Sequence, residues 1–130
     1  MARVLYLAGQ LPLIPAELID HDARRPVAPA RGITAEYGQY LAVGCAGCHG
    51  EDFSGSPVPG APPGTIVANL TRGGDVGQWT EVQFAAFLRS GVTPDGRAVD
   101  QEWMPIGSTK YMTGDEIAAV WLYLQSLPPR

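Results

Sequence analysis

Both cysteines of this 130-residue chain, and one of its two histidines, lie within five consecutive positions. Cys45 and Cys48 are three residues apart, and His49 follows directly. Near a helix end, two thiols at this spacing can each add to one vinyl group on the same edge of a haem, and the next residue then brings an imidazole nitrogen to iron. C-x-x-C-H is the attachment signature of c-type haem. The pattern therefore predicts one covalent haem c held by Cys45 and Cys48, with His49 as an axial ligand.

Three other uses of these residues compete with haem attachment. A structural zinc ion needs four ligands, and the only other thiolate or imidazole candidate is the distant His21. A thioredoxin-like redox pair requires a β-α-β context, which the sequence does not indicate. A disulfide between Cys45 and Cys48, with an incidental histidine, is the third alternative. Haem attachment is favoured over all three.

A haem iron needs a sixth ligand or leaves an open site, and methionine is the ligand that raises the reduction potential and suits electron transfer. Met104 is the predicted ligand, because it lies in the irregular segment E-W-M-P-I-G, 55 residues after His49. Pro105 favours an extended conformation at Met104. The alternatives are Met112, His21, an open site and simple core filling by Met104.

Three helices are predicted to position these groups, over residues 34–47, 80–90 and 113–126. Thr34 can cap the first helix, and Cys45 lies near its end. Residues at three- and four-residue spacing form one face of this helix: Tyr37, Tyr40, Leu41, Gly44 and Cys45. The pairs Thr80 with Gln83 and Thr113 with Glu116 form capping boxes for the other two. Residues 50–78 are rich in glycine and proline and predict a long loop, which must pack on something to be tolerated.

The helices and loops divide the chain into an arm, residues 1–33, and a domain, residues 34–130. Prolines at positions 12, 15, 26 and 29 argue against a long helix in the arm. It is either a segment packed on the domain surface or the remnant of a linker from an upstream membrane helix or domain. Residues 1–15 do not form a complete signal peptide.

Composition excludes several classes of protein. The net charge is −4 and no basic stripe is present, which argues against nucleic-acid binding. No apolar run reaches the 18 residues of a membrane span. Apolar residues make up 45% of the chain, as in a globular domain. No strand pattern and no internal repeat are evident, and the abundance of glycine and proline predicts long loops around a few helices.

The chain resembles the class I c-type cytochromes, and most of all the small monohaem domains related to cytochrome subunits of bacterial membrane dehydrogenases. The resemblance covers about residues 34–128. Its motifs are C-A-G-C-H at 45–49, A-N-L-T at 68–71, G-Q-W-T at 77–80, G-V-T-P-D-G-R at 91–97, W-M-P at 103–105 and M-T-G-D-E-I-A-A-V-W-L-Y-L-Q-S-L-P at 112–128.

The resemblance implies an all-α fold, the cytochrome c fold, with three main helices and long loops around a covalent haem. The first and last helices would cross beside it through Tyr40, Leu41, Trp121 and Leu124, and Gly44 would allow a close approach. Either Pro62 or Pro63 would offer the carbonyl that accepts a hydrogen bond from His49. Trp79, Arg72 and Arg97 are candidates to donate to a haem propionate, against core packing for Trp79 and solvated surface positions for the two arginines.

The function expected from this resemblance is one-electron transfer by a protein that is not an enzyme, although it could be a subunit of an oxidoreductase chain. The alternative is a haem sensor or enzyme with an open or labile sixth site. Covalent haem attachment in bacteria implies assembly outside the cytoplasm, so we expect a periplasmic protein or one at the outer face of the cytoplasmic membrane, with or without an upstream anchor. The expected partners are redox proteins such as a membrane dehydrogenase or terminal oxidase.

Overall fold

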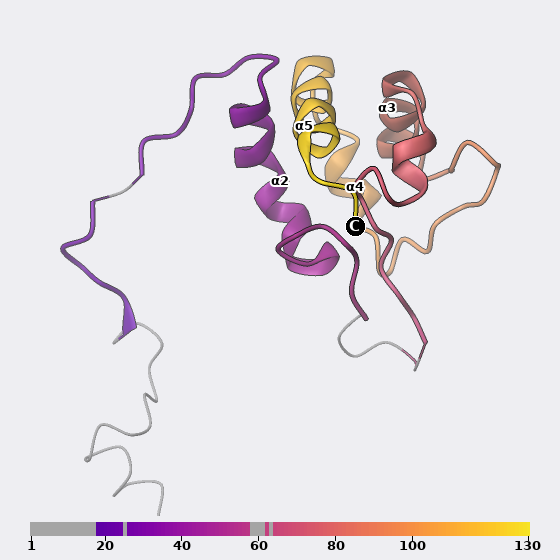
Figure 1. Ribbon diagram of the computed structural model, residues 1–130, viewed down its shortest axis with the longest axis horizontal. Helices are drawn as coiled ribbons and strands as arrows, with labels where there is room; N and C mark the ends of the chain where they lie inside the picture. Colours follow the sequence, from indigo (N-terminus) through magenta and orange to yellow (C-terminus); the bar gives the residue numbers. More distant parts are fainter. Residues whose placement is uncertain (1–17, 25, 58–61, 63) are drawn as a thin grey trace, which may run out of the picture.

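The computed structural model describes residues 18–24, 26–57, 62 and 64–130, and within these residues the fold is helical with long connections (Figure 1). The elements are α2 (Ala35–His49), the 3₁₀ turn η2 (Asp75–Gln78), α3 (Glu81–Ser90), α4 (Ile106–Thr109) and α5 (Gly114–Ser126). Two isolated antiparallel bridges, Pro57 with Ile66 and Val92 with Ala98, are the β-type pairings recorded in this part of the chain. The predicted all-α class is confirmed for this part of the chain.

The three predicted helices are present, and local capping explains where they begin. The Thr34 side chain accepts from the backbone N–H of Tyr37, and both predicted capping boxes form, at Thr80 and at Thr113. Gly91 ends α3 in the left-handed conformation, with φ 72°. α2 runs to His49, two residues beyond the predicted end, so the whole C-x-x-C-H motif is helical.

The helices α2 and α5 form the most extensive helix–helix contact, as predicted, but the glycine that allows their close approach is not the predicted one. The residues of α2 that are buried are Tyr37, Gly38, Ala42 and His49. Gly38 makes the close approach, because a Cβ built there would overlap the carbonyl oxygen of Ala119 in α5. The predicted Gly44 has open space around its Cα, and Tyr40 is 53% exposed. The predicted face is therefore confirmed at Tyr37, Leu41 and Cys45, which are buried or packed against the core, and wrong at Tyr40 and Gly44.

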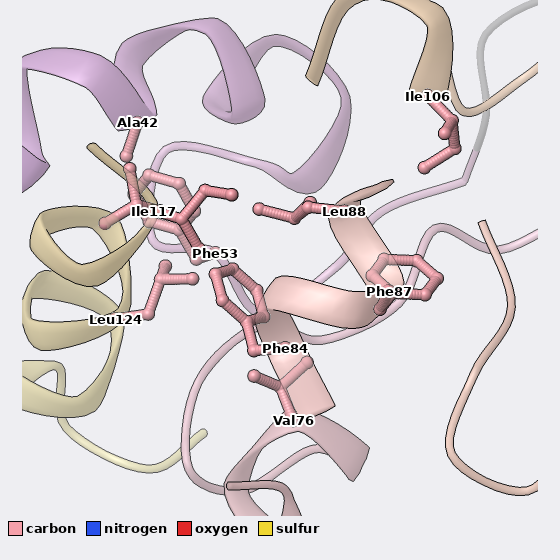
Figure 2. Packing of buried hydrophobic residues seen from close by; sticks show 10 residues of the cluster. Ala42, Phe53, Val76, Phe84, Phe87, Leu88, Ile106, Ile117 and Leu124 are labelled. Carbon is pink, nitrogen blue, oxygen red and sulfur yellow. The ribbon is translucent and has the colours of Figure 1, made fainter. Parts of the chain in front are cut away.

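The core lies between α2, α5 and α3 (Figure 2). Ile117 and Leu124 of α5 are almost fully buried, as the predicted stripe requires, and Phe84 of α3 packs its ring 5.4 Å from that of Trp121. The cluster also contains residues that link the helices to the loops: Ala42, Phe53, Val76, Leu88 and Ile106. The long loop 50–78 therefore contributes to the core through Phe53 and Val76.

The described residues of the N-terminal arm are mainly exposed, and Val27 is 95% exposed. The remainder of the predicted arm, residues 1–17 and 25, lies outside the described residues. Among the residues the structure describes, no helix combines the length and apolar character needed to cross a membrane.

Candidate haem site

The last turns of α2 carry the three residues of the attachment motif. Cys45 is half-buried and packs against the hydrophobic core, whereas Cys48 is exposed, and both are free thiols. His49 is the last residue of the helix and is 6% exposed. Gly50 ends the helix with φ 84°, a conformation that suits glycine. One thiol therefore lies against the core and the other at the surface, with the imidazole buried beside them.

The Nδ1 atom of His49 lies 2.8 Å from the carbonyl oxygen of Ala68. This contact fixes the ring and, with Nδ1 as the donor, leaves Nε2 as the nitrogen available to a metal. The prediction of a carbonyl from Pro62 or Pro63 was wrong for Pro62, because the acceptor beside Nδ1 is Ala68. Pro63 lies outside the described residues.

The loop places Ala68 at this position through backbone pairing. The N–H of Val67 donates to Ser56 O and that of Leu70 to Phe53 O, both at 2.8 Å. Ala68 lies between these two bonds. They hold its backbone next to residues 53–56, which follow His49 closely in the sequence. The A-N-L-T motif contains Ala68. Every residue has a backbone carbonyl, so the alanine side chain does not indicate that this carbonyl is the acceptor for His49.

Burial changes the protonation of the two inner groups of the motif. It lowers the pKa of His49, and the Ala68 carbonyl opposes this effect in part. Burial also raises the pKa of the Cys45 thiol, with a smaller contribution from the neighbouring Cys48. The neutral imidazole is the form that binds metals, so the environment of His49 suits an iron ligand.

Met104 and Met112 both lie half-buried against the same hydrophobic core as Cys45. Met104 precedes α4, and its backbone N–H donates to Asp100 O at 2.9 Å while its carbonyl accepts from Ile106 at 2.8 Å. Met112 lies two residues after Lys110, the C-cap of α4. It directly precedes Thr113, the N-cap of α5. The short helix α4 was not predicted, because four residues are too few to show a periodic pattern.

The three predicted propionate donors lie in different surroundings. Trp79 is half-buried, with its ring 5.2 Å from that of Phe87, and it lines one surface pocket together with Arg97. Arg97 is held by Asp95 at 2.7 Å and by Asp75 at 3.5 Å. Arg72 is exposed in the loop before η2. The structure thus brings Trp79 and Arg97 together, and a role toward a propionate stays a prediction for all three.

The donor set fits a covalent haem better than the alternatives. Two free thiols three residues apart on one helix, followed by a histidine whose Nδ1 is already paired, present the groups that c-type attachment needs. Zinc would need a cluster of four ligands, and the described part of the chain contains no group of three or more His, Cys, Asp or Glu side chains that could hold a metal ion.

Comparison with known proteins agrees with this geometry. Residues 35–128 match the family model described as Cytochrome c. No curated protein and no solved structure matches the chain. The match begins with α2 and ends just beyond α5, so it includes the attachment motif, the Ala68 loop and the Met104 segment. The chain therefore belongs to the cytochrome c family and carries haem c covalently through Cys45 and Cys48.

Proposed function

We propose that this haem-binding electron carrier is a class I cytochrome c that transfers single electrons, with His49 and Met104 as the two axial ligands of iron. The observation that carries the proposal is the buried His49 at the end of α2, with Nδ1 paired to Ala68 O at 2.8 Å. Two protein ligands leave no position for a substrate, and a covalently held group changes little between redox states. Both properties favour electron transfer over bond chemistry.

Met104 is favoured over Met112 by the roles of the neighbouring residues. Met112 lies directly before the Thr113 cap and packs against the core cluster that contains Ile117, as expected of a hydrophobic staple. Met104 lies before Pro105 in a segment with no such structural assignment. A thioether ligand also favours the ferrous state and raises the potential.

The proposed place of this carrier is the periplasm or the outer face of the cytoplasmic membrane, in a chain linked to respiration or to a membrane dehydrogenase. Assembly of c-type haem outside the bacterial cytoplasm supports the location. The motifs shared with cytochrome subunits of membrane dehydrogenases support the partner, which would be a redox protein such as that dehydrogenase or a terminal oxidase.

Absorption spectroscopy of the holoprotein, oxidised and then reduced, with and without carbon monoxide, tests this proposal. We expect sharp c-type bands on reduction, a weak long-wavelength methionine–iron band in the oxidised protein, and no change with carbon monoxide. Met104→Ala should abolish the weak band and create a carbon monoxide site. Met112→Ala is the matched control and should retain the band.

Two results would overturn the proposal. A strong response of the wild-type ferrous protein to carbon monoxide would favour a sensor or enzyme with an open or labile sixth site. Loss of the weak band in Met112→Ala, with the band intact in Met104→Ala, would transfer the axial role to Met112.

A further inference from the structure

Thr71 is a buried polar residue with no role in haem attachment. Among the described residues, His49 and Thr71 are the two buried polar side chains, and Thr71 is 0% exposed. It follows Ala68, the partner of His49, by three residues. A hydroxyl fully removed from water needs hydrogen-bond partners, so the bonds of Thr71 indicate which segments it joins.

The Thr71 hydroxyl uses its full hydrogen-bonding capacity. It donates to Asn69 Oδ1 at 2.8 Å and accepts from the backbone N–H groups of Gly73 at 3.2 Å and Arg130 at 3.0 Å. One donor and two acceptor positions are all that a hydroxyl offers. A single buried group therefore joins the Asn69 side chain after Ala68 to the backbone of the turn before η2 and of the segment that follows α5.

Asn69 makes a second connection between the same segments. Its Oδ1 accepts from the N–H of Thr71 at 2.8 Å, and its Nδ2 donates to the main-chain oxygen of Arg130 at 2.9 Å. Gly73 allows the close contact, because a Cβ there would overlap that same oxygen of Arg130. Arg130 is thus held against Asn69, Thr71 and Gly73 of this loop.

Asn69 is covalently attached to the carbonyl group that His49 uses. The backbone bonds of Val67 and Leu70 fix Ala68 against residues 53–56 on one side. The bonds of Asn69 and Thr71 fix the other side of the loop against the segment after α5. The orientation of the Ala68 peptide therefore depends on both sets of contacts.

We infer that Thr71 and Asn69 are positioning residues that hold the Ala68 carbonyl against Nδ1 of His49, and that they thereby help to set the reduction potential of the haem. The inference rests on the proposed ligation of iron by His49. A partner that accepts the second N–H of a ligating histidine orients the ring and makes the ligand more basic. A more basic ligand favours ferric iron, so loosening this contact should move the midpoint potential to more positive values.

The test compares the midpoint potential of the holoprotein with the solvent exchange of the His49 Nδ1 proton, measured by NMR in the ferrous state. Thr71→Val keeps the size of the side chain and removes the hydroxyl. We expect a more positive potential and about fivefold faster exchange, the factor that corresponds to the loss of one ordinary hydrogen bond. Asn69→Ala, at a half-buried position, is a second variant with the same expected direction.

Two controls separate positioning from general stability. Thr71→Ser retains the hydroxyl and should restore both the wild-type potential and the wild-type exchange rate. Thr113→Val makes the same chemical change at the cap of α5, away from the Ala68 loop, and should lower the melting temperature without moving either readout.

The outcomes distinguish this inference from the proposed function. If Thr71→Val and Asn69→Ala lower the melting temperature but leave the potential and the Nδ1 exchange unchanged, the two residues are only structural and the inference is overturned, while the electron carrier stands. If the wild-type protein shows no c-type spectrum, the proposed function fails and this inference fails with it.

Discussion

The two segments that would face iron from opposite sides are held in different ways. On the His49 side, residues far apart in the loop pair through their backbones, with Leu70 N–H bonded to Phe53 O at 2.8 Å. On the Met104 side, residues 100–110, the backbone bonds are local, such as Met104 N–H to Asp100 O at 2.9 Å. Contact of this second segment with α3 depends on side chains, including the Thr109 hydroxyl bonded to Leu88 O at 2.8 Å.

This difference indicates which half of the site is rigid. Backbone bonds between distant segments break together, whereas a segment with local bonds and few buried contacts can open alone. Ile106, which is 4% exposed, is the main buried anchor of the Met104 side (Figure 2). We therefore expect the histidine contact to persist under conditions in which the methionine contact is already lost. The predictions below test this comparison.

Gly55→Ala should have the largest effect, because it breaks the rigid half. Gly55 has φ 88°, and a Cβ there would overlap the carbonyl oxygen of Val67. Backbone strain and overpacking together should lower the free energy of unfolding by about 3 kcal/mol. Denaturant unfolding of the holoprotein measures this loss, and the Nδ1 exchange of His49 should become faster in the same variant.

Gly96→Ala is the matched control for that prediction. Gly96 has the same φ of 88°, but nothing lies within 4 Å of the position of a Cβ. Gly96→Ala should therefore lower the free energy of unfolding only through backbone strain, by about 1 to 2 kcal/mol. Equal losses in the two variants would show that the contact between Gly55 and Val67 contributes nothing to the rigidity of the His49 side.

Hydrogen exchange compares the two halves directly in the unmodified protein. The amides of Val67 and Leu70 should be protected about tenfold more than those of Met104 and Ile106, which corresponds to about 1.4 kcal/mol in the free energy of opening. All four amides donate to backbone oxygens at 2.8 to 2.9 Å, so the donor–acceptor distance is matched. Greater protection at Met104 and Ile106 would reverse the assignment of the rigid half.

Thr109→Val should loosen the Met104 side alone. Its hydroxyl donates to Leu88 O in α3, and loss of one such bond lowers stability by about 1 kcal/mol. The methionine–iron band should therefore disappear at a lower temperature, with the exchange of His49 Nδ1 unchanged. Thr109→Ser retains the hydroxyl and should behave as the wild type. A change in the exchange rate of the His49 Nδ1 proton would show that the two sides of the site are not independent.

The parts of the fold that the sequence predicted correctly are those determined by near neighbours. The capping boxes at Thr80 and Thr113 involve residues three positions apart, so their patterns mark the starts of α3 and α5. The attachment motif is equally local. Its chemistry follows from spacing along one helix, and the cytochrome c family was identified from it together with the ordered motifs that follow.

The parts that were missed depend on contacts between distant residues. Gly38 and Gly44 are the same residue type in the same helix, and only the packing of α5 shows that Gly38 makes the close approach. Ala68 is the acceptor for His49 because of pairing between residues 53–56 and 67–70. Pro62 and Pro63 were expected from the family resemblance, yet a backbone acceptor can belong to any residue.

Acid titration should give the smallest effect and show whether charge contributes to the difference between the two regions. Hydrogen bonds from Ser54, with a smaller effect of Arg130, lower the pKa of Asp52 in the His49 loop. Bonds from Thr93 and Arg97 lower the pKa of Asp95 in the turn after α3. A lowered folded-state pKa gives stability that is present above the ordinary value, near 3.9, and is lost as the pH falls through the folded-state pKa.

Asp52→Asn and Asp95→Asn each retain a side-chain acceptor but cannot titrate in this range, so each should flatten the fall of melting temperature between about pH 5 and pH 3. Both carboxylates are exposed, and the two effects should therefore be small and similar. Similar effects would leave backbone pairing, together with the neutral hydrogen bonds of Asn69 and Thr71, as the reason that the His49 side is rigid. A much larger effect for Asp52→Asn would instead assign that rigidity to charge, and would predict that salt weakens the histidine side first.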